Sequence, residues 1–281
     1  MHVQTINYIS ESAGRDFVDS LHETGFAVLR NHPIPQALLR NLNSDWLAFF
    51  LGKKKEHYLF DPSTDQGGRA GYFPQRISET AVGQTTKDLK EFFHVLPNGP
   101  MPPECADNIR QFREIGFELG AELLKWLQEF APQSVTESIS EPFSGMLCQH
   151  ASLFRILHYP PLGGDEAADA MRAAAHEDIN LLTILPVAEQ AGLQVKDKAG
   201  NWIDVSSKRG ELIINSGDML QEATAGFYPS TSHRVNNPGG AIKNESRISM
   251  PLFLTPRQEV KLSERHTSGS YLEERLNLIN G

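Results

Sequence analysis

The sequence has few cysteines and no long apolar run, and each shortage excludes a class of protein. Cys105 and Cys148 are the only cysteines among 281 residues, which excludes a disulfide framework and a CxxC zinc site. No apolar stretch reaches the roughly 20 residues that a membrane helix needs. Residues 1–14 lack the basic and apolar regions of a secretory signal. We therefore expect a cytoplasmic protein with no membrane partner.

Positive charge is also in short supply. Lysine and arginine number 26 against 35 aspartates and glutamates, so the formal net charge is −9. Proteins that bind nucleic acid broadly carry clustered positive charge, so we expect no nucleic-acid partner. Hydrophobic residues make up 40% and charged residues 22% of the chain, a balance that excludes a disordered protein. The chain is long enough to bury a core without disulfides or structural metals.

The pattern of apolar residues changes near the middle of the chain. The first half has helical spacing over residues 16–22, 36–50 and 106–130, with one short strand at residues 25–29. Residues 61–83, rich in glycine, serine and threonine, predict a long functional loop. The second half predicts short strands punctuated by glycine and proline. These lie at residues 153–159, 181–185, 192–195, 202–205, 211–215 and 247–254.

Many short strands with turn signals are typical of a β-sandwich or barrel, and the helical first half makes the fold class α+β. We expect one domain over residues 1–281. It has a mostly helical portion at 1–145, a β core at 146–256 and a C-terminal helix at 257–281. The capping-box spacing of Ser270 and Glu273 predicts where the last helix begins.

His176 and Asp178 are candidate metal ligands. Two residues apart on a helix they would point about 200° from each other, whereas on a strand they share a face. The apolar run at residues 181–185 indicates β structure, so both side chains can face inward. His233, at the start of another strand-like segment, is the best third ligand. Two histidines and one carboxylate suit either a non-haem Fe(II) site with open positions or a zinc site.

Arg247 and Ser249 favour an oxygenase over a hydrolase. The period of a strand puts both on one face, and a guanidinium directed into a barrel is costly unless it meets an anion. An arginine fork beside a hydroxyl suits a carboxylate. An internal salt bridge to aspartate or glutamate is the alternative when Arg247 is taken by itself.

These motifs, taken in order, resemble the isopenicillin N synthase-like Fe(II)/2-oxoglutarate-dependent dioxygenases along nearly the whole chain. The similar segments are Gly25–Pro35, Tyr159-Pro160-Pro161, His176–Leu185, Gly192–Val195 with Trp202, Asn215–Asp218, Ser232–Val235 and Arg247-x-Ser249. The resemblance implies a distorted double-stranded β-helix, or jelly roll, with helices packed around it.

The resemblance also implies a ligand set and a reaction. His176, Asp178 and His233 would bind Fe(II), while Arg247, Ser249 and Tyr159 would hold the distal carboxylate of 2-oxoglutarate. With O2, the co-substrate would give succinate and CO2 as a small substrate undergoes hydroxylation, desaturation or ring closure. The family includes Fe(II) oxidases of the isopenicillin N synthase type, which use no 2-oxoglutarate, so that reaction is an alternative. A zinc hydrolase and a non-catalytic metal-binding module are the others.

The substrate side of the site is less defined. Arg69, followed by Tyr72 and Phe73, resembles the segment with which isopenicillin N synthase takes a far carboxylate of its substrate. Together with Phe93, these residues are our candidate substrate contacts. They suggest a small anionic molecule. The sequence indicates nothing about the oligomeric state.

Overall fold

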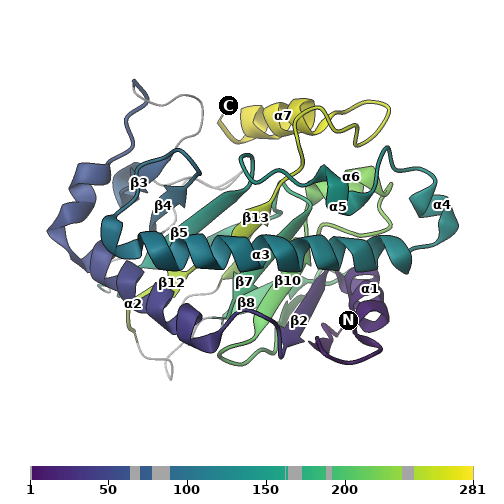
Figure 1. The fold of residues 1–281 in the computed structure, drawn as a ribbon, viewed down its shortest axis with the longest axis horizontal. Coiled ribbons are helices and arrows are strands. Elements are labelled where there is room, and N and C mark those ends of the chain that lie inside the picture. Colours follow the sequence, from purple (N-terminus) through teal and green to yellow (C-terminus); the bar gives the residue numbers. More distant parts are fainter. Residues whose placement is uncertain are drawn as a thin grey trace.

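The structure is a computed structural model that describes residues 2–63, 70–77, 89–161, 163, 173–187, 192–235 and 244–280. Within these residues two β-sheets pack against each other. Helices cover the outer face of the larger sheet (Figure 1). This arrangement is the distorted double-stranded β-helix that the sequence predicts. In the part of the chain described, every helix is too short or too polar to cross a membrane.

The major sheet runs from β1 to β3 in the order β1-β2-β10-β7-β13-β5-β4-β3, and β12 also pairs with β5. All its pairs are antiparallel except β1 with β2. The strands are β1 (Thr5–Asn7), β2 (Phe26–Arg30), β3 (Gly71–Phe73), β4 (Glu91–Val95), β5 (Leu153–Tyr159), β7 (Leu182–Pro186), β10 (Leu212–Ser216), β12 (Arg247–Ser249) and β13 (Leu252–Leu254).

The minor sheet has the order β6-β11-β8-β9. Its strands are β6 (Ala173–His176), β8 (Leu193–Lys196), β9 (Trp202–Asp204) and β11 (His233–Val235). A small apolar cluster joins the two sheets, with Phe26, Val28 and Ile213 from the major sheet and Leu193 and Val195 from the minor one. The space between the sheets is therefore closed by apolar packing at this level.

The main core lies between the major sheet and three helices. These are α1 (Ala13–Thr24), α2 (Gln36–Leu51) and α3 (Pro103–Glu129), which lies across the sheet in Figure 1. Gly116 and Gly120 let α3 approach β13 closely, because a Cβ there would come within 2.7 Å of Leu252 and 2.2 Å of Leu254. The shorter helices are α4 (Gln133–Thr136), α5 (Phe143–Met146), α6 (Asp218–Ala223) and the 3-10 turns η1 (Lys53–Tyr58) and η2 (Gln75–Ile77).

The long helices and most strands of the second half are confirmed, but the first half is less helical than predicted. It supplies four strands to the major sheet, and β3 lies inside the segment predicted as a loop. Three residues are too few for a periodic signal, so only pairing with β4 shows that β3 is a strand. The strand predicted over residues 247–254 is also broken, because Pro251 cannot donate to a ladder.

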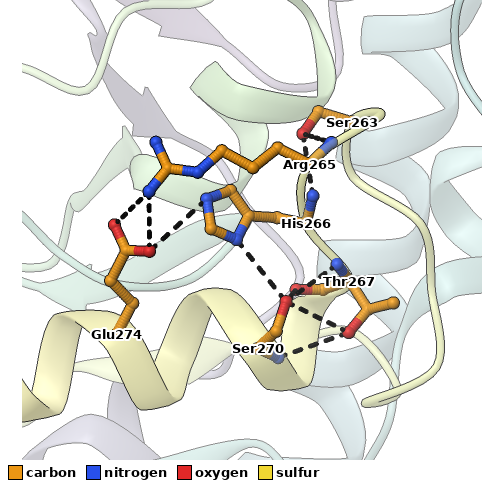
Figure 2. A network of polar contacts seen from close by, with 6 residues as sticks. All are labelled: Ser263, Arg265, His266, Thr267, Ser270 and Glu274. Carbon is orange, nitrogen blue, oxygen red and sulfur yellow. Dashed lines mark hydrogen bonds and ion pairs between the residues drawn. The ribbon is translucent and has the colours of Figure 1, made fainter.

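The last helix, α7 (Ser268–Asn280), begins earlier than the predicted capping box. Thr267 and Ser270 cap it reciprocally: the Ser270 hydroxyl accepts from the Thr267 amide at 3.1 Å, and the Thr267 hydroxyl accepts from the Ser270 amide at 3.3 Å. Figure 2 shows Glu274 reaching back from the helix to Arg265 and His266. These contacts fasten the start of α7 to the preceding loop.

A buried polar cluster ties η1 and β3 to the outer face of β4 and β5. The Glu91 carboxylate accepts hydrogen bonds from the His158 imidazole at 2.7 Å, from the Lys55 ammonium at 2.9 Å and from the Tyr72 hydroxyl. Burial by itself would raise the pKa of Glu91, but these donors outweigh it and lower the pKa. Ionised Glu91 therefore stabilises the folded state.

We expect Glu91→Gln to lower the free energy of unfolding of the metal-free protein by about 1–3 kcal/mol at pH 7. Because the folded pKa is lowered, this stabilisation is complete above the unfolded pKa and disappears as the pH falls through the folded pKa. Urea unfolding measured across this pH range should show that the two proteins differ less in free energy of unfolding as the pH falls. Glu129→Gln, on an exposed turn of α3, is the control, and equal stability at pH 7 would contradict the prediction.

Candidate metal centre

Two histidines meet because β11 pairs with β6. His233 begins β11 and lies directly opposite His176, the last residue of β6, with ring centroids 4.4 Å apart. β11 also pairs with β8, where His233 lies opposite Val195, so this strand holds His233 in register from the other side. Residues 57 positions apart in the sequence thus become neighbours through one antiparallel ladder.

Asp178 joins these histidines by a route that differs from our prediction. It does not share a strand with His176, because β6 ends at His176 and Asp178 lies in the connection that leads from the minor sheet to β7 in the major sheet. Its Oδ1 lies 3.9 Å from Nε2 of His176 and 3.9 Å from Nε2 of His233. The three candidate ligand atoms all lie within 4.8 Å of one another.

Both imidazoles present the nitrogen that a metal needs. Nδ1 of His176 lies 2.8 Å from the carbonyl oxygen of Ala174, and Nδ1 of His233 lies 3.2 Å from that of Thr231. A carbonyl only accepts, so the proton sits on Nδ1 and the lone pair of Nε2 faces the shared space. The donor set fits Fe(II), because two imidazoles and a carboxylate leave further coordination positions open.

The second oxygen of Asp178 is held by the surrounding core. Oδ2 accepts hydrogen bonds from the Thr183 hydroxyl at 2.6 Å and from the Asn215 amide at 2.9 Å. The Asn180 amide donates in turn to the Thr183 hydroxyl at 2.8 Å. With Oδ2 satisfied, Oδ1 is the oxygen that remains directed at the histidines.

These supporting residues were not among the predicted site residues. Thr183 and Asn215 lie in segments that carry the family resemblance, and this resemblance is the feature of the sequence that could have identified them. They are register partners on β7 and β10, so both approach Asp178 from the major sheet. Gly217 completes this cradle, since a Cβ there would come within 2.2 Å of Asn180 Oδ1 and 2.7 Å of the Asp178 carbonyl.

The electrostatics favour the ligand forms of these groups. Burial opposes ionisation of Asp178, but the two imidazoles and the hydrogen bonds from Asn215 and Thr183 outweigh it and lower its pKa. Loss of water contact, followed by the nearby His233, lowers the pKa of His176. At neutral pH Asp178 is therefore a carboxylate and His176 is neutral.

The C-terminal helix contacts the residues around Asp178. Nη2 of Arg275 on α7 lies 2.8 Å from Asp218 and 3.8 Å from Glu177, the residue between two candidate ligands. The Asp218 amide also donates to the Asp178 carbonyl at 2.8 Å. These contacts fix the backbone on both sides of Asp178.

Arg247, Ser249 and Tyr159 come together on the inner face of the major sheet. Arg247 is the register partner of Tyr159, and its guanidinium carbon lies 6.0 Å from the centroid of that ring. Arg247 is buried, and with Ser249 it lines an open cavity whose other walls come from both sheets. A buried guanidinium beside a hydroxyl fits a ligand carboxylate.

The structure separates the predicted substrate contacts. Phe73 lies on the inner face, in the apolar cluster that includes Tyr159. Tyr72 and Phe93 lie on the opposite face, in the core beneath α2. There the ring centroids of Phe93 and Trp46 are 5.1 Å apart. The structure therefore does not bring Tyr72 and Phe93 to the metal side, because neighbouring strand residues point to opposite faces. Arg69 lies outside the described residues.

Comparison with known proteins supports the assignment of the fold and the class. The 2OG-Fe(II) oxygenase superfamily model matches residues 150–256, and the model of the non-haem dioxygenase in morphine synthesis N-terminal region matches residues 9–114. A Shewanella oneidensis protein described as an oxygenase is 47% identical, with a TM-score of 0.89 over 100% of this chain and 99% of that one.

Two further relatives are more distant. Proline hydroxylase buaE of Petromyces alliaceus is 28% identical over 93% of this chain and 90% of its own length. A full-length Neurospora crassa protein, solved in complex with alpha-KG, is 21% identical to this chain. Its TM-score of 0.79, over 97% of this chain and 95% of that one, shows that the two share a fold. The chain therefore belongs to the 2OG-Fe(II) oxygenase superfamily and is an Fe(II)- and 2-oxoglutarate-dependent dioxygenase.

Proposed function

We propose that His176, Asp178 and His233 bind Fe(II), and that the enzyme oxidises a small anionic organic molecule at this centre. The convergence of two imidazole nitrogens and one carboxylate oxygen within 4.8 Å carries the proposal. The chemistry supplied by bound Fe(II) is oxidative decarboxylation of 2-oxoglutarate to succinate and CO2, coupled to oxidation of the substrate. The protein positions the reactants and keeps Asp178 ionised.

We also propose that Arg247, Ser249 and Tyr159 hold the distal carboxylate of 2-oxoglutarate. The guanidinium is already fixed by burial and by its place in the ladder beside Tyr159, so little order is lost when a carboxylate binds. The open cavity lined by Arg247 and Ser249 gives an anion a path to the guanidinium. In this arrangement the chain itself binds and orients the co-substrate.

Residues 1–281 act as one domain in this proposal. The N-terminal portion contributes β2, which pairs with β10, and β4, which pairs with β5. β10 carries Asn215, and β5 carries Tyr159. Removing the N-terminal strands would therefore expose both edges of the sheet segment that supports the site.

We expect Asp178→Ala to abolish Fe(II) binding while the protein stays folded, because the two imidazoles alone lack the charged ligand. Fe(II) is added anaerobically, followed by 2-oxoglutarate, and the visible metal-to-ligand charge-transfer band is recorded. The unaltered protein should show the band, release succinate when O2 is admitted, and lose both with the substitution. Asp204→Ala, on the outer edge of the minor sheet, is the matched control. Full turnover by the Asp178 variant would overturn the ligand assignment.

Thr183→Val tests the hydrogen bond that orients the Asp178 carboxylate. The substitution keeps the side-chain shape but removes the donor to Oδ2, so we expect Fe(II) affinity to fall by about 10–100-fold. Metal titration followed by the charge-transfer band measures this loss. Thr224→Val removes another buried hydroxyl, one that bonds within α6, and should leave affinity unchanged. Equal Fe(II) affinities in the two variants would refute the positioning role.

Arg247→Lys separates co-substrate binding from metal binding. Lysine keeps the positive charge but cannot form the paired hydrogen bonds of a guanidinium, so we expect the Kd for 2-oxoglutarate to rise by about tenfold or more. Fe(II) affinity should stay the same, since Arg247 is not a metal ligand. Titration of the charge-transfer band measures both, and Arg110→Lys, on the exposed face of α3, is the control. An unchanged 2-oxoglutarate affinity would place its carboxylate elsewhere.

A further inference from the structure

The strand that carries Arg247, the proposed co-substrate anchor, has little backbone support. β12 has three residues and, in the part of the chain that the structure describes, pairs with β5 alone. Its ladder begins with Arg247 opposite Tyr159, so continuing the register places Ser246 opposite Pro160. Proline has no amide hydrogen, and the ladder therefore gains no hydrogen bond from Pro160. The position of Ser246 depends on other contacts.

A side-chain hydrogen bond supplies such a contact. Oγ of Ser246 lies 3.1 Å from Nε2 of His158 on β5. His158 pairs with Ile248 across the ladder, so Ser246 is its diagonal neighbour on the outer face of the sheet. This bond joins the residue that precedes Arg247 to the residue that precedes Tyr159.

The polar cluster on the outer face fixes the His158 ring. Burial by itself would raise the pKa of Glu91, but its hydrogen-bond donors lower it, so Glu91 is a carboxylate. Nδ1 of His158 lies 2.7 Å from Oε1 of Glu91. A carboxylate only accepts, so Nδ1 carries a proton and Nε2 of the neutral ring accepts from the Ser246 hydroxyl. The ring is buried and stacks on Phe50, with centroids 5.2 Å apart.

Glu91 is in turn held by two other elements. The Lys55 ammonium on η1 donates to it at 2.9 Å, and the Tyr72 hydroxyl on β3 donates to the same carboxylate. A continuous path of hydrogen bonds therefore runs from η1 and β3 through Glu91 and His158 to Ser246. The cluster beneath the helices thus reaches the backbone that carries Arg247 on the inner face.

The position of Arg247 affects how well it can bind a carboxylate. Paired hydrogen bonds from a guanidinium require direction as well as charge. A group that is fixed before the ligand arrives loses less order on binding, so it binds more tightly than a loosely held one. A shift at Ser246 moves the neighbouring backbone, and with it the guanidinium at the end of a long side chain. Contacts that fix Ser246 therefore favour binding at Arg247.

We propose that His158 is a positioning residue for the co-substrate anchor: its hydrogen bond with Ser246 orients Arg247 toward the distal carboxylate of 2-oxoglutarate. This role rests on the proposed function, since it needs Arg247 to bind that carboxylate. His158 lies on the outer face of the sheet and acts only through the backbone between Ser246 and Arg247.

Ser246→Ala removes the hydroxyl and leaves the rest of the residue in place. We expect the Kd for 2-oxoglutarate to rise by about 3–10-fold, as the loss of one hydrogen bond requires, and Fe(II) affinity to stay within about twofold. Titration of the charge-transfer band without O2 measures both affinities. Ser246→Thr keeps a hydroxyl and should bind like the unaltered enzyme. Ser140→Ala, which removes a hydroxyl bonded to the Lys261 carbonyl at 2.8 Å, is the matched control.

His158→Phe tests the same hydrogen bond from the other partner. Phenylalanine keeps an aromatic ring against Phe50 but offers Ser246 no acceptor, so the Kd for 2-oxoglutarate should again rise. Combining His158→Phe with Ser246→Ala should weaken binding no further than His158→Phe alone, because both changes remove one interaction. If His158→Phe does not fold by circular dichroism, the alanine and threonine variants of Ser246 decide the question.

The outcomes separate this role from the proposed function. An unchanged 2-oxoglutarate affinity in Ser246→Ala would overturn the role of His158 and leave the proposed function standing. Equal losses of Fe(II) and 2-oxoglutarate affinity, or additive effects in the double variant, would also overturn it. If Arg247→Lys leaves 2-oxoglutarate affinity unchanged, or the unaltered enzyme shows no band, the proposed function fails and the role of His158 fails with it.

Discussion

The antiparallel pairing of β11 with β6 is the constraint that creates the candidate site. It sets His233 opposite His176, at the end of a short sheet that has little core of its own. The apolar residues between the sheets, including Val195 and Phe26, hold that sheet against the larger one. The histidine pair is therefore only as well ordered as the packing between the two sheets.

Asp178 links the two sheets at this point. The chain leaves β6 after His176 and enters β7 of the major sheet at Leu182, so the carboxylate lies in the crossover. Thr183 and Asn215, on adjacent strands of the major sheet, donate hydrogen bonds to Oδ2 of Asp178 and so fix the carboxylate. Two candidate ligands thus come from the minor sheet, while the orientation of the third comes from the major sheet. The geometry of the centre therefore depends on how the two sheets pack against each other.

The major sheet separates two functions by the alternation of its side chains. Its outer face carries Tyr72, Glu91 and Phe93 and binds the helices through a buried polar cluster and aromatic packing. Its inner face carries Arg247 and Tyr159 beside the cavity. Residues adjacent in the sequence, such as Glu91 and Phe92, therefore face different surroundings, one in the core under the helices and one on the inner face. The same separation explains how one sheet can hold a dry core and a polar site.

The residue types, their order and much of the local structure follow from the sequence alone. Helical spacing predicted α1, α2 and α3, and the ordered motifs pointed to His176, Asp178 and His233 as candidate ligands, because chemistry and local periodicity are encoded in short segments. Once pairing shows β3 to be a strand, alternation makes Tyr72 and Phe73 face opposite ways. Which of the two faces the metal depended on the three-dimensional packing, since that is fixed by the side of the sheet that the helices cover. The short strand β3, the place of Asp178 outside a strand, and the support from Asn180, Thr183 and Asn215 likewise arise from contacts between segments distant in the chain.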